Sequence, residues 1–341
     1  IEPVRVIVVP VRPDVPRFDV GGPVLLGDVA VISSSQLGFA GVDWRRGTLL
    51  WTKPTGLHVA PPIVKGDSAI LIGACINPPE LPRASDTLLG CLRVVTATGV
   101  DQSYGAIRGT NLEAFAAEPG PQAVWLDGDR AVRWRRGERA VSVDLITGVA
   151  RPAPIEPPPI HVTHRDRSWD ITHTEGRIIA RAKGKIAWQT QRTYTAMIGA
   201  VYLAEASPMI RVIQVGPFDG RAELNLLDMD ATGSLHGQAA FPVPAISVLG
   251  QAVDNVGNTA IAARIDSSLV HDFVVGYAAN AMRVYVYPLP EILRADPVGV
   301  AVAPDAVIAF HDGDTLTVLP ELSPPPTAPG AATAPSQNPT P

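Results

Sequence analysis

Long apolar runs are missing from this sequence, and lysine is scarce. No uninterrupted apolar stretch approaches the ~20 residues that a helix needs to cross a bilayer, so we expect no transmembrane segment. Only four of the 28 basic residues are lysine, and the other 24 are arginine, an imbalance that we attribute to a GC-rich bacterial genome. No basic stretch followed by an apolar one stands near Ile1, which is consistent with a processed form or a fragment; we expect an exported form from which a signal peptide was removed.

Catalytic and cofactor motifs are absent as well. The sequence contains no G-x-S-x-G elbow, no phosphate-binding loop, no H-E-x-x-H helix and no haem-attaching C-x-x-C-H. Its serine, histidine and aspartate residues are scattered without a spacing that marks a nucleophile. We therefore predict no catalytic residue and no cofactor. The net charge of −5 gives no general attraction to nucleic acid or to an anionic membrane.

Proline and glycine, in contrast, are abundant. The 34 Pro and 30 Gly make up about 19% of the 341 residues, against a usual ~12%. Proline inside a helix costs about 3 kcal/mol, so long helices are excluded, whereas short strands joined by turns accommodate both residues. The hydrophobic fraction of 46% is high enough for a large core. The composition therefore favours an all-β protein.

A repeat of strands and tight turns runs along the chain. Residues 28–73 contain three short apolar strands, a W-R-R-G turn and a step into a fourth strand. Related turns follow at an average spacing of about 44 residues, at Gly47, Gly99, Gly148, Gly184, Gly233, near Asn280 and at Gly313. A repeated four-stranded antiparallel unit of this length is typical of a propeller blade. Seven turns predict a seven-bladed β-propeller; a stack of sandwiches or two separate β domains is the alternative.

The ends of the chain are expected to lie outside the repeats. We divide the sequence into an N-terminal extended segment (1–20), the propeller (21–322) and a Pro-rich tail (323–341). Because a ring must cover its first and last edges, the strand at 4–11 is predicted to pair with the last blade near 307–318. The Pro-rich stretch 152–160 is predicted to cross from one blade to the next as extended polyproline.

The only two cysteines, Cys75 and Cys91, lie near the base of one predicted hairpin. There they can form a disulfide across the strands, which would stabilise the fold by about 3 kcal/mol and indicate an oxidising compartment. Two buried free thiols are the alternative. Two residues are too few to hold a metal.

Two polar segments are candidate sites. The sequence HVTHRDRSWDITH offers His161, His164 and His173 with nearby aspartates as ligands for a transition metal, although a solvated edge strand and loop accounts for it better, and we predict no metal site. The arginine-rich segment 130–139 surrounds a tryptophan and is a candidate partner-binding surface. Its candidate residues are Arg133, Trp134, Arg135 and Arg136.

The acidic turns and the tail have simpler explanations. Asp228 and Asp230, like Asp312 and Asp314, lie at blade turns, where a carboxylate caps backbone N–H groups, and no downstream acid completes a Ca²⁺ loop. The tail carries seven prolines and no charge, and Pro324, Pro325 and Pro326 are candidates for contact with a partner subunit.

The repeat at 41–73 resembles that of the PQQ-like β-propellers, whose pattern is roughly D-x-x-T-G, a tryptophan four residues after the glycine, and then P-x-V-x-x-D. Asp43, Gly47, Trp51, Pro62 and Asp67 match this pattern. Further repeats match in part, at Asp144, Thr147, Gly148, Trp188 and Gly233.

The resemblance implies the non-enzymatic scaffold branch of the family. The quinone-binding dehydrogenases of the family have adjacent cysteines that this chain lacks. We therefore expect a non-catalytic binding or scaffold subunit of a bacterial cell-envelope or extracellular assembly. It would lie in the periplasm, be associated with the outer membrane or be secreted, and it would bind other protein subunits. The alternative is a secreted propeller enzyme or ligand-binding protein that uses the central funnel.

Overall fold

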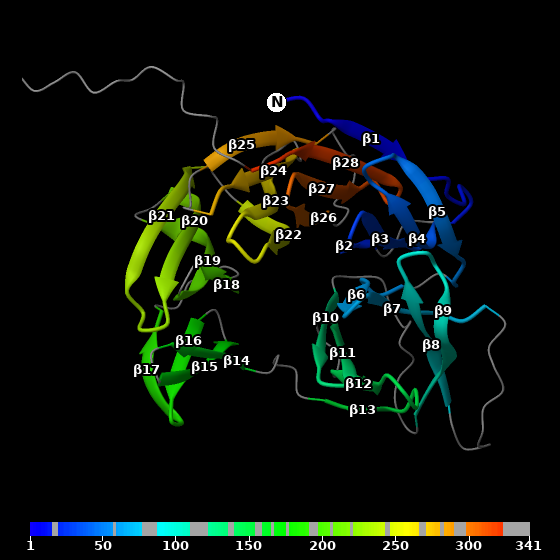
Figure 1. Ribbon diagram of the computed structural model, residues 1–341, viewed down its shortest axis with the longest axis horizontal. Helices are drawn as coiled ribbons and strands as arrows, with labels where there is room; N and C mark the ends of the chain where they lie inside the picture. The colour runs from blue at the N-terminus through cyan, green and yellow to red at the C-terminus, as the bar shows by residue number, and fades with distance from the viewer. Residues whose placement is uncertain are drawn as a thin grey trace, which may run out of the picture.

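Seven four-stranded antiparallel sheets form the blades of a propeller (Figure 1), which confirms the predicted fold class. The computed structural model describes residues 1–15, 20–56, 59–76, 87–109, 122–135, 140–153, 159–164, 167–174, 177–190, 197–204, 207–218, 221–242, 246–265, 271–279, 283–289 and 298–322. All regular structure in these ranges is β-strand, and none of it is a helix long and apolar enough to cross a membrane.

The blades follow one another in chain order. Blade 1 contains β2 (Val20–Leu26), β3 (Val29–Ser34), β4 (Gly38–Asp43) and β5 (Thr48–Lys53), and blade 2 contains β6 (Ile63–Lys65), β7 (Ser68–Gly73), β8 (Thr87–Thr96) and β9 (Asp101–Gly109). Blade 3 contains β10 (Gln122–Asp127), β11 (Arg130–Arg135), β12 (Val141–Asp144) and β13 (Ala150–Pro152), and blade 4 contains β14 (Ile160–His164), β15 (Arg167–Thr174), β16 (Arg177–Ala182) and β17 (Lys185–Gln189).

The remaining blades complete the ring. Blade 5 contains β18 (Met197–Ala204), β19 (Ser207–Phe218), β20 (Arg221–Asp230) and β21 (Leu235–Pro242), and blade 6 contains β22 (Ile246–Val253), β23 (Thr259–Ile265), β24 (His271–Tyr277) and β25 (Arg283–Pro288). Blade 7 combines β26 (Gly299–Ala303), β27 (Ala306–His311) and β28 (Thr315–Pro320) with β1 (Arg5–Val8) from the other end of the chain.

The strand β1 closes the ring. It pairs antiparallel with β28, with Ile7 opposite Leu316, which confirms the predicted closing strand. Ile7 joins a hydrophobic cluster shared by blades 7 and 1 that includes Ile32 and Phe310. Across the same junction, the Ser34 hydroxyl donates to the carbonyl of Gly313 at 2.7 Å. The first and last blades are therefore held by strand pairing, apolar burial and hydrogen bonding together.

Turns between the third and fourth strands of several blades are capped by aspartate. In blade 1 the backbone N–H of Arg46 donates to the Asp43 carboxylate at 2.8 Å, and Gly47 adopts a φ of 75°. In blade 3 the Asp144 carboxylate accepts from the Thr147 backbone at 2.8 Å and from its hydroxyl at 2.9 Å. These hydrogen bonds lower the pKa of Asp144. Asx-type capping and a positive φ are the reasons why these residue types recur at the predicted turns.

Two tryptophans connect one blade to the next through equivalent contacts. The indole Nε1 of Trp51, in β5 of blade 1, donates to the Ala97 carbonyl of blade 2 at 2.9 Å. A Cβ added to Gly99 would lie 2.4 Å from the Trp51 ring, so only glycine fits beneath it. Trp188 in blade 4 donates to the Ala231 carbonyl of blade 5 at 2.8 Å and stands over Gly233. Each of these two tryptophans therefore contacts the turn of the following blade and joins that blade to its own.

Apolar packing joins most neighbouring blades. The described residues form six hydrophobic clusters, each with members from two adjacent blades. They join blades 7 and 1, 1 and 2, 2 and 3, 4 and 5, 5 and 6, and 6 and 7. Within the described ranges no such cluster joins blades 3 and 4. Six junctions of the seven are thus built on buried apolar side chains.

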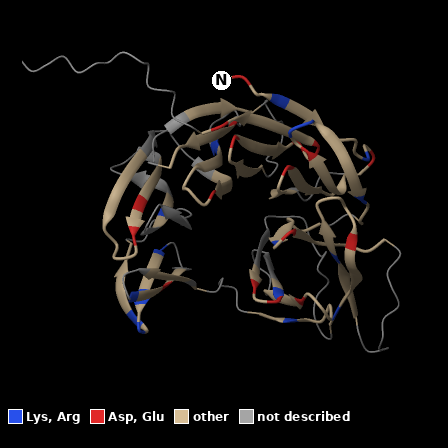
Figure 2. Cartoon of the chain, in the orientation of Figure 1, with Lys and Arg blue, Asp and Glu red and all other residues tan. Residues whose placement is uncertain are grey.

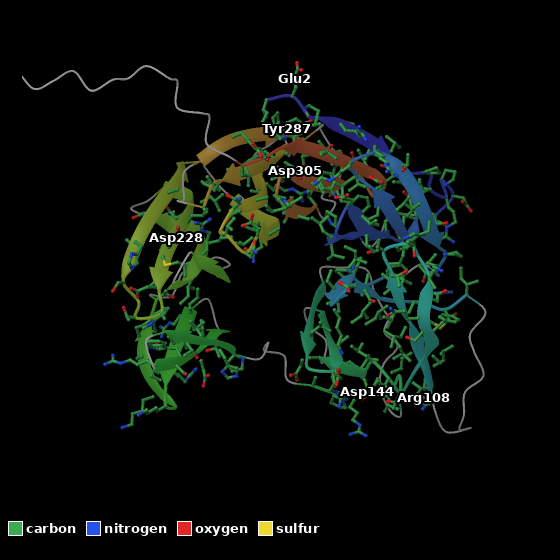
Figure 3. The ribbon with its side chains drawn as sticks, in the orientation of Figure 1. Glu2, Arg108, Asp144, Asp228, Tyr287 and Asp305 are labelled. Carbon is green, nitrogen blue, oxygen red and sulfur yellow. A yellow bond between two sulfur atoms is a disulfide. The ribbon has the colours of Figure 1, made fainter. Side chains whose placement is uncertain are left out.

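A buried arginine adds a polar link between blades 5 and 6. Arg211 in β19 is fully buried, and its guanidinium forms a two-pronged ion pair with Asp228, labelled in Figure 3, at 2.7 and 2.6 Å. The same group donates to the Thr259 hydroxyl at 2.6 Å and to the Ala279 carbonyl at 2.8 Å in blade 6. These hydrogen bonds compensate the cost of burying the charge.

Removing the apolar contact of the closing strand should destabilise the whole ring. We expect Ile7→Ala to lower the free energy of unfolding by about 2–4 kcal/mol, because Ile7 is 8% exposed in the cluster between blades 7 and 1. Its neighbour Val6 is 54% exposed, so Val6→Ala should cost less than about 1 kcal/mol. Urea unfolding measures the free energy of unfolding of both variants. An equal loss of stability in the two variants would contradict the closure of the ring by β1.

Candidate interaction site at the junction of blades 3 and 4

The sheet of blade 4 has one apolar face and one polar face. Val162, Trp169 and Ile171 are buried in a cluster with residues of β19 and β20, so this face packs on blade 5. Residues alternating with them point to the opposite face, since successive side chains of a strand alternate. In register across β14, β15 and β16, His161, Asp170 and Arg181 form one row of that second face.

Hydrogen bonds connect the polar side chains of this second face. His161 Nδ1 lies 2.6 Å from Asp170 Oδ1, and the Thr163 and Ser168 hydroxyls are 3.1 Å apart. The Arg181 guanidinium donates to the Thr172 hydroxyl at 3.1 Å. The side chain of His161 is 79% exposed and that of Asp170 45%. The polar face is therefore solvated.

Blade 3 also packs one face on a neighbouring blade, but on the side away from blade 4. Ala131 and Val143 are buried in the cluster with blade 2, and the alternate positions belong to the other face. That face has both polar and apolar positions: Ser142 lies opposite Arg151 on one side and opposite Val132 on the other, and Val132 lies opposite Trp125. Ser142 is buried, and its hydroxyl accepts a hydrogen bond from Arg130 Nε at 3.1 Å. Arg151 is exposed.

The second faces of blades 3 and 4 are turned toward the junction between these blades. Blade 3 packs its first face on blade 2 and blade 4 packs its first face on blade 5, so the remaining faces are on the side of this junction. Figure 1 shows the ribbons of β10–β13 and β14–β17 standing apart at this junction. We call these two surfaces the seam; its polar described residues are Arg130, Ser142 and Arg151 of blade 3 and His161, Thr163, Ser168, Asp170, Thr172, Arg177 and Arg181 of blade 4, and by register Val132 and Ile179 share the same faces.

The chain's positive charge is concentrated in the segment 122–190, which contains blades 3 and 4. Residues 122–190 contain 12 basic and 8 acidic residues, a net charge of +4. The rest of the chain contains 16 basic and 25 acidic residues, a net charge of −9. Figure 2 shows Lys and Arg gathered on blade 4.

The predicted metal candidates lie at the seam or beside it. His161 belongs to β14 and is bonded to Asp170; the backbones of His164 and His173 lie in β14 and β15, and their side chains lie outside the described residues. The prediction of an edge strand and a loop was too coarse, because this segment forms two paired strands of one blade. Among the described side chains, no group of three potential ligands comes together.

The other predicted site residues are only partly described. Arg133, Trp134 and Arg135 lie in β11 by their backbone, while their side chains and all of Arg136 lie outside the described residues. The same holds for the tail residues Pro324, Pro325 and Pro326. The partner-binding role of both segments stays a prediction.

The two cysteines form a disulfide. Cys75 follows β7 and Cys91 lies in β8, with their Cα atoms 5.1 Å apart. The Tyr104 ring stacks with the Arg93 guanidinium beside this bond, at 3.8 Å from the ring centroid. The prediction of a cross-strand bridge at the base of the hairpin is confirmed.

Sequence reasoning missed Arg151, Arg177 and Arg181 as site residues. Two signals pointed to them. The alternation of polar and apolar residues through 161–172 indicated one solvated face, and the local excess of positive charge marked two adjacent blades in an acidic chain. The alternation alone does not say which neighbouring blade the polar face meets.

Comparisons with known proteins show the fold. No family model matches the chain, and no curated protein sequence is significantly similar to it. A chain of a mitotic checkpoint complex is similar with a TM-score of 0.53 and 9% identity, over 94% of this chain and 92% of that one. The β-propeller domain of Cps50 (Swd1) from Myceliophteria thermophila reaches 0.50 and 10% identity, over 92% and 99%. BamB from Moraxella catarrhalis reaches 0.44 and 11% identity, over 93% and 96%.

The turn of blade 5 below Trp188 predicts a pH effect. Burial disfavours the charged form of Asp230, but hydrogen bonds from the Thr232 hydroxyl, His236 and backbone N–H groups outweigh it and lower the pKa of Asp230 to about 2. Because this is below the ordinary value of ~3.9, the charged carboxylate stabilises the fold above about pH 4, and this stabilisation is lost as the pH falls toward 2.

We expect Asp230→Asn to lower the free energy of unfolding by about 1 kcal/mol at pH 7, and the difference from the unchanged chain to shrink as the pH approaches 2. Asp67→Asn, at an exposed turn, is the control; this variant should change the free energy of unfolding by less than about 0.5 kcal/mol both at pH 7 and near pH 2. Thermal unfolding across this pH range measures the effect; a difference that does not depend on pH would contradict it.

Proposed function

We propose that this protein is a non-catalytic binding subunit of a bacterial cell-envelope or extracellular assembly, and that it binds partner proteins at the seam. The observation that carries the proposal is the contrast among the junctions. Six junctions bury apolar side chains, whereas no apolar cluster joins blades 3 and 4 among the described residues, and His161 and Asp170 on that side of blade 4 are exposed. Exposed charged faces held on a rigid frame suit recognition of a partner.

The repeat geometry supports an assignment to the PQQ-like propellers. Trp51 and Trp188 occupy the tryptophan position of the repeat pattern, and each reaches the turn glycine of the following blade. A contact that recurs in two blades is a stronger indication than one matching sequence segment. On this assignment the chain is a member of the scaffold branch without a bound quinone.

The disulfide supports an exported location. A bond between Cys75 and Cys91 persists in the periplasm or outside the cell and is rare in the cytosol. We propose that the mature chain lies in the periplasm, is associated with the outer membrane or is secreted. Its partners would be other protein subunits of the same compartment.

Affinity purification from the native envelope tests this function. We expect the tagged full-length chain to retain the same partner protein in repeated purifications, at a stoichiometric ratio, identified by mass spectrometry. The control is a chain unfolded by Val307→Asp, which places a charge at a fully buried position and should retain nothing specific. Recovery of the folded chain alone from both the envelope and the secreted fraction would contradict the proposal.

A further inference from the structure

The closing strand β1 carries an exposed row of valines. Val4, Val6 and Val8 are 67%, 54% and 66% exposed, and all three point to one face of the sheet because side chains alternate along a strand. Among the described side chains, no other strand exposes three large apolar residues. We call these three residues the valine stripe. In blade 7, β1 has a neighbouring strand on one side only, and an apolar edge strand of this kind invites pairing with another chain.

The strand register shows which face of blade 7 carries the valine stripe. Val6 lies opposite Thr317 of β28, and Leu319 shares the face of Thr317 because it is two residues further along the strand. Leu319 is buried in the cluster between blades 6 and 7, so the stripe lies on the face turned toward blade 6. The outer strand of blade 6, β25, comes close there, since the Tyr285 hydroxyl donates to the Pro320 carbonyl at 3.1 Å. Figure 1 shows β1 and β25 on the outer rim of the ring.

The chain leaves blade 7 on this same face. Leu322, two residues after the end of β28, is 3% exposed and belongs to the cluster between blades 6 and 7. A Cβ added to Gly276 would lie 2.3 Å from the Leu322 side chain, so residue 322 is packed on blade 6. The Val318 carbonyl accepts a hydrogen bond from the Val4 N–H at 2.8 Å. The tail 323–341 therefore begins on the face of the stripe, a few residues beyond the partner of Val4.

From this arrangement we infer that the Pro-rich tail 323–341 docks on the valine stripe of its own chain and covers the edge of the closing strand. The inference goes beyond the proposed binding function and does not depend on the seam. The tail carries seven prolines and no charged residue, so its contact with three valines buries no charge. Pro-rich segments bind apolar surfaces as preformed polyproline helices, which lose little conformational entropy on docking.

Reach and tethering favour the tail over another occupant. A polyproline segment advances about 3.1 Å per residue, so about five residues cover the stripe, and the tail has 19 residues. A segment tethered this close to its site has an effective concentration in the millimolar range, which allows a site of only three valines to be occupied. Proline has no N–H to donate to a strand ladder, so the docked tail would cover the edge without extending the sheet.

Photo-crosslinking in the full-length chain tests the inference. The photoreactive amino acid p-benzoylphenylalanine replaces Val6, and the purified protein is irradiated at low concentration, digested and analysed by mass spectrometry. We expect crosslinks from position 6 to residues within 323–341, in protein that migrates as a monomer. The control places the same probe at Leu235, which is 55% exposed on β21, the outer strand of blade 5. This control should give no crosslink to the tail.

Matched substitutions locate the contact. With the probe at Val4, the double variant Val6→Ser with Val8→Ser should lower the yield of crosslinks to the tail by about fivefold or more, because it removes the apolar surface that the tail contacts. Leu49→Ser with Leu50→Ser makes a similar change on β5, the outer strand of blade 1, and should lower the yield by less than about twofold. All four positions are exposed, so both variants should fold like the unchanged chain.

Several results would overturn the inference. Absence of crosslinks from position 6 to the tail, or equal yields from positions 6 and 235, would mean that the tail does not dock on the stripe. A crosslinked dimer would mean that a second copy covers the stripe, and crosslinks to another protein in the native envelope would assign it to a partner. None of these results bears on the seam, whose role is tested separately by the affinity purification.

Discussion

Burial of apolar side chains between neighbouring blades is the interaction on which this structure depends. A single four-stranded blade has two faces and cannot cover either by itself, so each blade relies on its neighbours. The ring obtains this cover at six junctions, from the cluster of Ile7, Ile32 and Phe310 at the closure to that of Val162 and Trp169 between blades 4 and 5. Strand β1, near the N-terminus, also pairs with β28, near the C-terminus, and this pairing closes the ring.

The seventh junction follows a different rule. On the side of blade 3, blade 4 carries hydroxyls, a histidine–aspartate pair and Arg181, and the surrounding sequence is basic in a chain that is acidic elsewhere. On this side of blade 4 the residues His161, Thr163 and Ser168 are exposed, whereas Thr172 and Arg181 are half-buried and hydrogen-bonded to each other. Because apolar packing holds the ring at six junctions, the junction between blades 3 and 4 does not have to stabilise the fold. This difference links the fold to the proposed function.

Much of the fold was predictable because propeller blades repeat. The spacing of turn glycines gave the blade number, Trp188 was matched to Trp51, and the closing strand and the disulfide were placed correctly. The seam was harder to predict, since the alternation through His161 and Asp170 marks a polar face without naming its neighbour. Arg211 was missed for a related reason: its partners Asp228 and Thr259 are 17 and 48 residues away, so their contact depends on how blades pack.

The solvent accessibility of His161 tests the central claim most directly. Diethyl pyrocarbonate modifies accessible imidazoles, and mass spectrometry of the digested protein gives a rate for each histidine. The side chain of His161 is 79% exposed, whereas that of His311, in β27 of blade 7, is 1% exposed. The account predicts rapid modification of His161 in the native protein and modification of His311 only on unfolding. Equal protection of both would mean that blades 3 and 4 pack like the other pairs and would contradict the account.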